Sequence, residues 1–176
     1  MPVETLNLLV GIGTIVLQAV TVALLVAFLL RGRVPLFEEV IRPFGRYGYW
    51  IALLAALTAS VLSLYYSLVV GYPPCELCWW QRIFMYPQVV LFALALWLQD
   101  SRAALYSIAL SVIGLGIGIY NHLLQVAPAG TLPCPAQGVS CSQIFYLEFG
   151  YITFPMLAIT FFAFLIVLML IVRRDA

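Results

Sequence analysis

Residues 75–82 of this chain read Cys75-Glu76-Leu77-Cys78-Trp79-Trp80-Gln81-Arg82. The stretch places two cysteines three positions apart at the start of a long apolar segment, and an arginine four positions after the second cysteine. Residues three or four positions apart lie on one face of a helix. An arginine at the centre of a membrane span is unfavourable by at least about 2.5 kcal/mol, and by less near the interface. The stretch therefore suggests redox chemistry coupled to a component of a lipid bilayer.

The composition around this stretch is that of an integral membrane protein. The 176 residues are 65% hydrophobic and 9% charged, whereas soluble domains contain roughly 25% charged residues. The formal net charge is +1, so the chain lacks the basic surface of a nucleic-acid-binding protein. The four cysteines are an even number and lie in segments outside the apolar runs, which favours an oxidising compartment.

Five apolar runs are long enough to cross a membrane, because a spanning helix needs about 20 mostly apolar residues. They cover residues 6–30, 49–70, 79–98, 103–122 and 151–172, and they predict an all-α integral membrane protein. The first run follows no basic segment and is too long for the core of a signal peptide, so we expect a retained helix. Gly114 and Gly118 in the fourth run predict close packing against another helix.

Residues 31–48 separate the first two runs and contain four arginines, two glutamates and two prolines. One interpretation is a plain polar linker. The other is a short interfacial helix over residues 36–41 that ends at Pro43, because proline disrupts the interior of a helix. Either way, the sequence predicts an N-terminal unit, residues 1–48, made of a transmembrane helix and a cytoplasmic linker.

The arginines also predict the topology. Segments 31–46, 100–102 and 173–174 hold seven of the eight arginines, and positively charged loops face the cytoplasm. The C-terminus is then cytoplasmic, whereas the N-terminus and both cysteine-containing loops, residues 71–78 and 123–150, lie outside. Arg82 is the single arginine within an apolar run.

The first cysteine pair has the spacing of an exchangeable disulfide, because Cys75 and Cys78 meet when the segment is helical. The positive end of the helix dipole favours a thiolate at Cys78, and Arg82 on the same face adds to this effect. A static disulfide is an alternative, as is a zinc site that uses all four cysteines, although the spacing of Cys134 and Cys141 is unusual for zinc. Haem attachment is excluded because Trp79 stands where the motif needs histidine.

The second pair, Cys134 and Cys141, would alone suggest a structural disulfide. Because the predicted topology puts it on the same face as Cys75 and Cys78, a relay by thiol–disulfide exchange is possible. His122, near the outer end of the fourth run, either packs and hydrogen-bonds, or serves the head group of a ligand or a proton path.

Residues 74–87, Pro74-Cys75-Glu76-Leu77-Cys78-Trp79-Trp80-Gln81-Arg82-Ile83-Phe84-Met85-Tyr86-Pro87, resemble the signature of the DsbB/BdbC family of disulfide-bond formation proteins. A second resemblance covers residues 138–142 and 149–157. The similarity extends from about Tyr49 to the C-terminus, and the short gap between Cys134 and Cys141 is more similar to the BdbC branch.

This resemblance implies a four-helix bundle, residues 49–176, in the bacterial plasma membrane, with the N-terminal helix as an addition. It implies a quinone-dependent enzyme that oxidises a DsbA- or BdbD-like thioredoxin-fold partner and reduces a membrane quinone, either ubiquinone or menaquinone. By position, Cys78 would face the quinone with Arg82 in contact with it, and Cys75 would be the partner of Cys78. The thioredoxin-fold protein would attack Cys134, and Cys141 would exchange with Cys75.

Three points stay open at this stage. His122 is a further candidate for quinone binding. Leu68 stands where BdbC-like members commonly have an acidic residue. A membrane scaffold or transporter subunit with two static disulfides is an alternative function, and spacing does not fix the direction of electron flow, since direction depends on reduction potentials.

Overall fold

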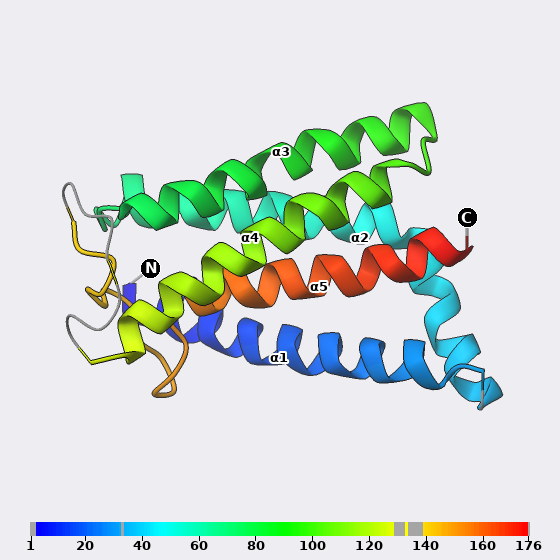
Figure 1. Ribbon diagram of the computed structural model, residues 1–176, viewed down its shortest axis with the longest axis horizontal. Coiled ribbons are helices and arrows are strands. Elements are labelled where there is room, and N and C mark those ends of the chain that lie inside the picture. The colour runs from blue at the N-terminus through cyan, green and yellow to red at the C-terminus, as the bar shows by residue number, and fades with distance from the viewer. Residues whose placement is uncertain (1–2, 33, 129–132, 134–138, 176) are drawn as a thin grey trace.

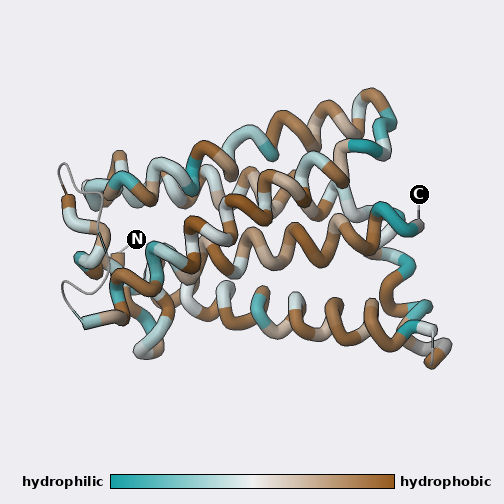
Figure 2. The backbone as a smooth tube through the Cα atoms, in the orientation of Figure 1, coloured by the Kyte–Doolittle hydropathy of each residue, from teal (hydrophilic) through white to brown (hydrophobic). Residues whose placement is uncertain are grey.

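The computed structural model describes residues 3–32, 34–128, 133 and 139–175. These residues form five helices, α1 (Val3–Leu30), α2 (Pro35–Leu68), α3 (Glu76–Leu98), α4 (Ala103–Val126) and α5 (Phe154–Asp175). All five are long and apolar enough to cross a membrane, and they lie side by side along the long axis of the molecule (Figure 1). Hydrophilic residues gather mainly at the two ends of this bundle (Figure 2). The predicted all-α, multi-pass membrane architecture is confirmed.

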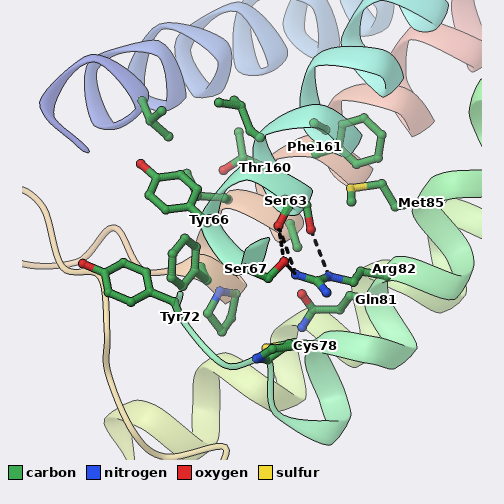
Figure 3. Close-up of a pocket in the computed structure, with 18 of the residues that line it drawn as sticks. Ser63, Tyr66, Ser67, Tyr72, Cys78, Gln81, Arg82, Met85, Thr160 and Phe161 are labelled. Carbon is green, nitrogen blue, oxygen red and sulfur yellow. Dashed lines mark hydrogen bonds between the residues drawn. The ribbon is translucent and has the colours of Figure 1, made fainter. Parts of the chain in front are cut away.

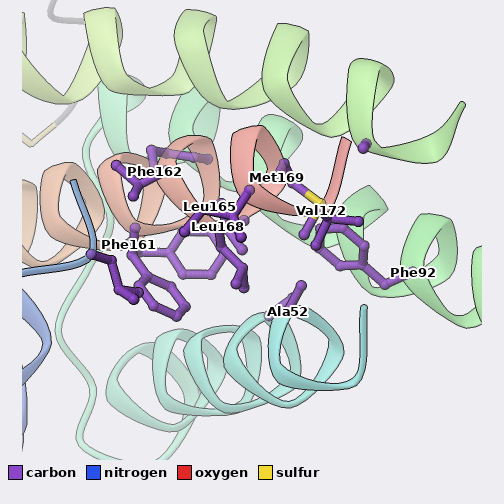
Figure 4. Close-up of a cluster of buried hydrophobic side chains, with 14 of the residues drawn as sticks. Ala52, Phe92, Phe161, Phe162, Leu165, Leu168, Met169 and Val172 are labelled. Carbon is purple, nitrogen blue, oxygen red and sulfur yellow. The ribbon is translucent and has the colours of Figure 1, made fainter. Parts of the chain in front are cut away.

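Helix α5 is the centre of the bundle. It is the most buried of the five spans and packs against α1, α2 and α4, whereas α3 packs against α2 and α4. Its apolar side chains supply most of the core, which Figure 4 shows between α2, α3 and α4. The fully buried members of this core from α5 are Phe162, Leu165, Leu168, Met169 and Ile171. An apolar helix surrounded by others is expected to be hydrophobic on all sides, as this one is.

The contact between α4 and α5 depends on glycine. A Cβ atom added to Gly114 would collide with the ring of Phe162, including its Cε2 atom at 2.6 Å. A Cβ at Gly118 would lie 3.1 Å from Ile159 Cγ1. Small residues allow helix backbones to approach closely in membranes, where dispersion contacts drive association. The close packing predicted for Gly114 and Gly118 is confirmed.

A fully buried polar cluster joins α3 to α4. Ser107 Oγ donates to Gln88 Oε1 at 2.6 Å, and Gln88 Nε2 donates to Ser111 Oγ at 2.9 Å. All three residues have no exposed surface. Hydrogen bonds between membrane helices have no competing water and help to fix their relative rotation. This cluster therefore sets which face of α3 turns toward α4.

Neither interpretation of residues 31–48, a plain polar linker or a short helix that ends at Pro43, fits the structure, because residues 35–48 form the first part of a long helix. Helix α2 begins at Pro35 and continues through Pro43 to Leu68. Figure 1 shows its first turns at an angle to the rest of the helix, at the end of the bundle near the C-terminus. A proline in a membrane helix is tolerated where neighbouring helices and local adjustment satisfy the freed carbonyl. Five residues beyond Pro43, Gly48 lies directly against Val172 of α5.

The fifth helix differs slightly from its apolar run. It begins at Phe154 rather than at Tyr151, with Pro155 in its first turn, where proline is well tolerated. Residues 148 and 152 pair through backbone hydrogen bonds before the helix starts.

We predict that Gly114→Ala lowers the free energy of unfolding by about 1–3 kcal/mol, because the added methyl group overpacks the contact with Phe162. Thermal unfolding in detergent, followed by tryptophan fluorescence, measures the effect. Gly116→Ala is the matched control, since nothing lies within 4 Å of its added Cβ. Equal stability of the two variants would contradict the proposed role of Gly114.

Candidate functional site

The first two cysteines come together because a helix starts between them. Gly71, with a φ of 84°, turns the chain after α2, and an extended segment leads to Cys75, the N-cap residue of α3. Cys78 follows in the first turn of the helix. The two Sγ atoms lie 2.9 Å apart. The predicted dithiol is therefore assembled by local backbone geometry alone.

Helix α4 supplies a polar neighbour to both sulfur atoms. Asn121 is fully buried, and its Nδ2 atom lies 4.0 Å from Cys75 Sγ and 3.8 Å from Cys78 Sγ. An N–H donor aimed at sulfur stabilises negative charge on that sulfur. Asn121 was not among the site residues predicted from the sequence. A signal was present, however, because Asn121 continues the line of small residues on α4 at positions 107, 111, 114 and 118.

Cys141 reaches the same place from the connection between α4 and α5. It is 1% exposed and packs with Cys75, Leu77 and Leu124. Its thiol interacts with that of Cys75 by hydrogen bonding. Three of the four predicted catalytic cysteines are thus in one cluster, with Cys75 in contact with both others. The fourth, Cys134, lies outside the described residues.

The environment of Cys75 favours its protonated form. The hydrogen bond to Cys78 and then burial raise the pKa of the Cys75 thiol above its ordinary value. The Cys75 thiol is therefore the member of the pair whose surroundings favour retention of its proton.

Arg82 is tied to α2. Its Nε donates to Ser63 Oγ at 3.0 Å, and its Nη2 donates to Ser63 O at 3.1 Å and to Ser67 Oγ at 2.8 Å (Figure 3). Its Cζ atom also lies 5.0 Å from the centre of the Trp79 ring. These contacts place a positive charge, 9% exposed, beside the cysteine cluster. They explain how an arginine is accommodated inside an apolar span, since its polar groups are satisfied by neighbouring helices.

A cavity of about 620 Å³ opens between α1, α2, α3 and α5. Its polar end contains the three described cysteines together with Gln81 and Arg82. Gln81 is 7% exposed, and its Nε2 atom has no hydrogen-bond partner in the described part of the chain. A buried N–H group left unpaired costs about 1–3 kcal/mol. A ligand with a carbonyl oxygen would satisfy this donor, three positions after Cys78 and so on the same helical face.

The quinone predicted from the sequence fits this lining. A quinone presents carbonyl oxygens to hydrogen-bond donors, and Gln81 Nε2 and the Arg82 guanidinium are donors at the same end of the cavity as Cys78. Gln81 was missed by the sequence analysis, although its spacing from Cys78 carried the same signal as that of Arg82.

His122 takes a different position. Its Nδ1 atom lies 3.4 Å from Thr153 Oγ1, at the junction between α4 and the start of α5. The residues that line the cavity do not include His122. A contact between His122 and a quinone therefore stays a prediction from the sequence.

Residues 45–172 match the family model described as disulfide bond formation protein DsbB. This chain belongs to the DsbB family. It is 38% identical over 131 residues to disulfide bond formation protein C of Bacillus subtilis (strain 168), an alignment that covers 73% of this chain and 92% of the relative. It is 40% identical over 129 residues to a probable disulfide formation protein C of Halalkalibacterium halodurans, covering 73% of this chain and 92% of the relative.

A third relative, a probable disulfide formation protein of Coxiella burnetii (strain CbuK_Q154), is 39% identical over 121 residues, covering 67% of this chain and 82% of the relative. No solved structure matches the chain. Disulfide formation proteins are oxidoreductases, so this DsbB-family chain is a membrane oxidoreductase of that kind. The family match begins within α2, and α1 lies outside it.

We predict that Cys78→Ala raises the rate of alkylation of Cys75 in the reduced protein by about tenfold near pH 8. Loss of the hydrogen bond lowers the pKa of the Cys75 thiol, and one pKa unit changes the thiolate population tenfold below the pKa. Peptide mass spectrometry after timed exposure to iodoacetamide measures the rate. The same proteins unfolded in denaturant are the control, and there Cys75 should react equally fast in both. A slower reaction in folded Cys78→Ala would contradict this account.

Proposed function

We propose that this chain is a membrane thiol oxidase that accepts electrons from a DsbA- or BdbD-like thioredoxin-fold protein and passes them to a membrane quinone. One observation carries the proposal. Cys75 contacts Cys141 on one side and Cys78 on the other, and Cys78 lies in the wall of a cavity that also contains Gln81 and Arg82. Thiol–disulfide exchange needs direct approach of two sulfur atoms, and this cluster provides it.

The relay begins with both cysteine pairs oxidised. A thiolate of the partner attacks Cys134, forming a mixed disulfide and releasing Cys141 as a thiolate. Cys141 attacks Cys75, forming a Cys141–Cys75 disulfide and releasing Cys78 as a thiolate. The second thiol of the partner resolves the mixed disulfide, so the partner leaves oxidised and Cys134 is left as a thiol.

The second half of the relay restores both pairs. Cys134 attacks Cys141, which re-forms the Cys134–Cys141 disulfide and releases Cys75 as a thiol. Cys75 and Cys78 then lose two electrons and two protons as their disulfide forms, and a quinone held by Gln81 and Arg82 would take up both and leave as quinol. One partner disulfide is made and one quinone is reduced per cycle.

The other residues of the site act on charge and position. Gln81 Nε2 donates a hydrogen bond to a carbonyl oxygen, and the Arg82 guanidinium stabilises negative charge that develops on that oxygen during reduction. Asn121 holds the two sulfur atoms of the first pair and stabilises the thiolate of Cys78.

The orientation is part of the proposal. Figure 1 shows that the N-terminus, the connection from α2 to α3 and the connection from α4 to α5 lie at one end of the bundle, and the C-terminus at the other. The arginines at positions 173 and 174 mark the C-terminal end as cytoplasmic. The cysteines then face the outside of a bacterial plasma membrane, where the thioredoxin-fold partner is found.

Quinol formation tests the proposal. The purified chain is mixed with a reduced thioredoxin-fold dithiol and a quinone, and quinol is followed by its absorbance. We expect one quinol for each disulfide formed in the partner. Absence of quinol, with both disulfides of the chain resistant to mild reductant, would instead identify a membrane scaffold with static disulfides.

We predict that Gln81→Leu raises the KM for quinone by about tenfold, because the variant keeps the bulk of the side chain and loses the hydrogen bond to the carbonyl oxygen. Steady-state quinol formation at a saturating dithiol concentration gives the KM. Trp80→Leu is the control, since Trp80 is exposed and does not line the cavity. A similar KM in both variants would remove Gln81 from the binding site.

We predict that Cys134→Ser abolishes oxidation of the protein partner, because the partner then has no disulfide to attack. Dithiothreitol, which can reduce the Cys75–Cys78 pair directly, still drives quinol formation by this variant. The two assays are run on the same preparation. Oxidation of the protein partner at the normal rate would contradict the relay order.

A further inference from the structure

We propose that α1 forms the wall that holds the isoprenoid tail of the quinone, and so makes this chain selective for long-tailed quinones. The inference rests on the proposed function and extends it to a helix that lies outside the family match. It is carried by two observations. Helix α1 is fixed to the bundle by specific polar contacts, and a separate set of its side chains lines the cavity that contains Cys78 and Arg82.

The polar contacts come from two residues three helical turns apart. Asn7 Oδ1 accepts a hydrogen bond from Tyr66 of α2 at 2.8 Å. Gln18 Nε2 donates to Thr160 Oγ1 of α5 at 3.0 Å, and Gln18 Oε1 accepts from Tyr151 at 2.8 Å. Such bonds are not exchanged for water within a bilayer. These contacts at two points along the helix fix both its axial position and its rotation relative to α2 and α5.

Glycine brings α1 close to the segment that precedes α5. A Cβ atom added to Gly11 would lie 3.0 Å from Phe149 Cε2 and 3.2 Å from Glu148 Cβ. Gly11 also lies between Asn7 and Gln18. A helix held this closely at several points is part of the fold rather than a separate anchor in the membrane.

With that rotation fixed, a second group of α1 residues faces the cavity: Leu9, Val10, Gly13, Thr14 and Leu17. The facing wall is also largely apolar, with Leu54 and Leu62 from α2 and Leu157 and Phe161 from α5. Figure 3 shows α1 on the side of the cavity away from Cys78. The cavity is thus polar at the end with Gln81 and Arg82 and apolar along α1.

A ligand that matches both parts has a carbonyl-bearing head and a long apolar chain. The volume of about 620 Å³ is several times the roughly 150 Å³ that accommodates a benzene-sized ring, so a quinone head alone leaves much of the cavity unfilled. Burying the chain stabilises the complex by about 0.8 kcal/mol for each methylene group. Isoprenoid units of a membrane quinone are the occupants that connect the head at Cys78 to the wall at α1.

The wall formed by α1 lies outside residues 45–172, the region that the family model matches. The alignments with the proteins of Bacillus subtilis and Halalkalibacterium halodurans cover 92% of each relative. Too little of either relative remains for a further helix of 28 residues. The groove between α2 and α5 is therefore covered by an additional helix in this chain.

The test compares two quinones with the same head group, one with a long isoprenoid tail and one with a single isoprenoid unit. Gly13→Phe is the test variant, because an added Cβ at Gly13 meets nothing within 4 Å and the phenyl ring fills the tail region. We expect the ratio of KM for the long-tailed to the short-tailed quinone to rise about tenfold. Ala19→Phe is the matched control, since Ala19 is exposed and does not line the cavity, and it should leave the ratio unchanged.

A second measurement does not depend on the folding of a variant. A long-tailed quinone with a photoreactive group at the end of its tail is bound to the wild-type chain and activated, and the labelled peptide is found by mass spectrometry. We expect the label on α1, and excess unmodified long-tailed quinone should prevent it.

Two results would overturn the inference while leaving the oxidase proposal intact. One is that Gly13→Phe, like Ala19→Phe, leaves the ratio of KM for the long-tailed to the short-tailed quinone unchanged. The other is labelling of the cavity-facing residues Val10, Gly13 and Thr14 of α1 by a photoreactive phospholipid in the presence of saturating long-tailed quinone, which would assign the wall to a lipid chain. By contrast, failure of the wild-type chain to reduce either quinone would refute the proposed function itself.

Discussion

The hydrogen bonds from Arg82 to Ser63 and Ser67 join α3 to α2 at the level of the cavity. A guanidinium in an apolar span must have its donors satisfied by the protein, because the bilayer core offers none. This requirement fixes α2 beside the first turns of α3, where the dithiol is formed. It also leaves a positive charge facing the cavity, so one constraint serves both the packing of the helices and the chemistry of the site.

The requirement that buried polar groups find hydrogen-bond partners within the protein also acts at the other helix contacts. Gln88 with Ser107 and Ser111 holds α3 on α4, and this contact turns Asn121 toward the two sulfur atoms. Asn7 and Gln18 hold α1 on α2 and α5. Polar side chains are few in this chain, and these act as connections between helices at chosen points. The cavity lies between α1, α2, α3 and α5, and the residues of three of these connections, Tyr66, Arg82 and Thr160, are part of its lining.

Features set by local spacing could be predicted from the sequence. The five spans follow from runs of apolar residues, the dithiol from the three-residue spacing of Cys75 and Cys78, and the close contact of α4 with α5 from Gly114 and Gly118. Features that depend on which helices are neighbours could not be predicted from the sequence. Pro43 was expected to end a helix because proline disrupts a helix interior, yet α2 continues through it. The place of α1 in the cavity wall was missed because it depends on which helices are neighbours, although Asn7, Gly11, Thr14, Gln18 and Thr21, spaced alternately by four and three residues, mark one face of that helix.

Cys75 lies just outside α3 and Cys78 lies within its first turn, which the hydrogen bond from Trp79 N–H to Cys75 O closes at 3.2 Å. The two sulfur atoms are 2.9 Å apart, and a covalent bond between them requires about 2.05 Å. Closing or opening that bond therefore needs a movement of less than about 1 Å at two side chains. Oxidation and reduction of this pair therefore require no rearrangement of the helix that carries it.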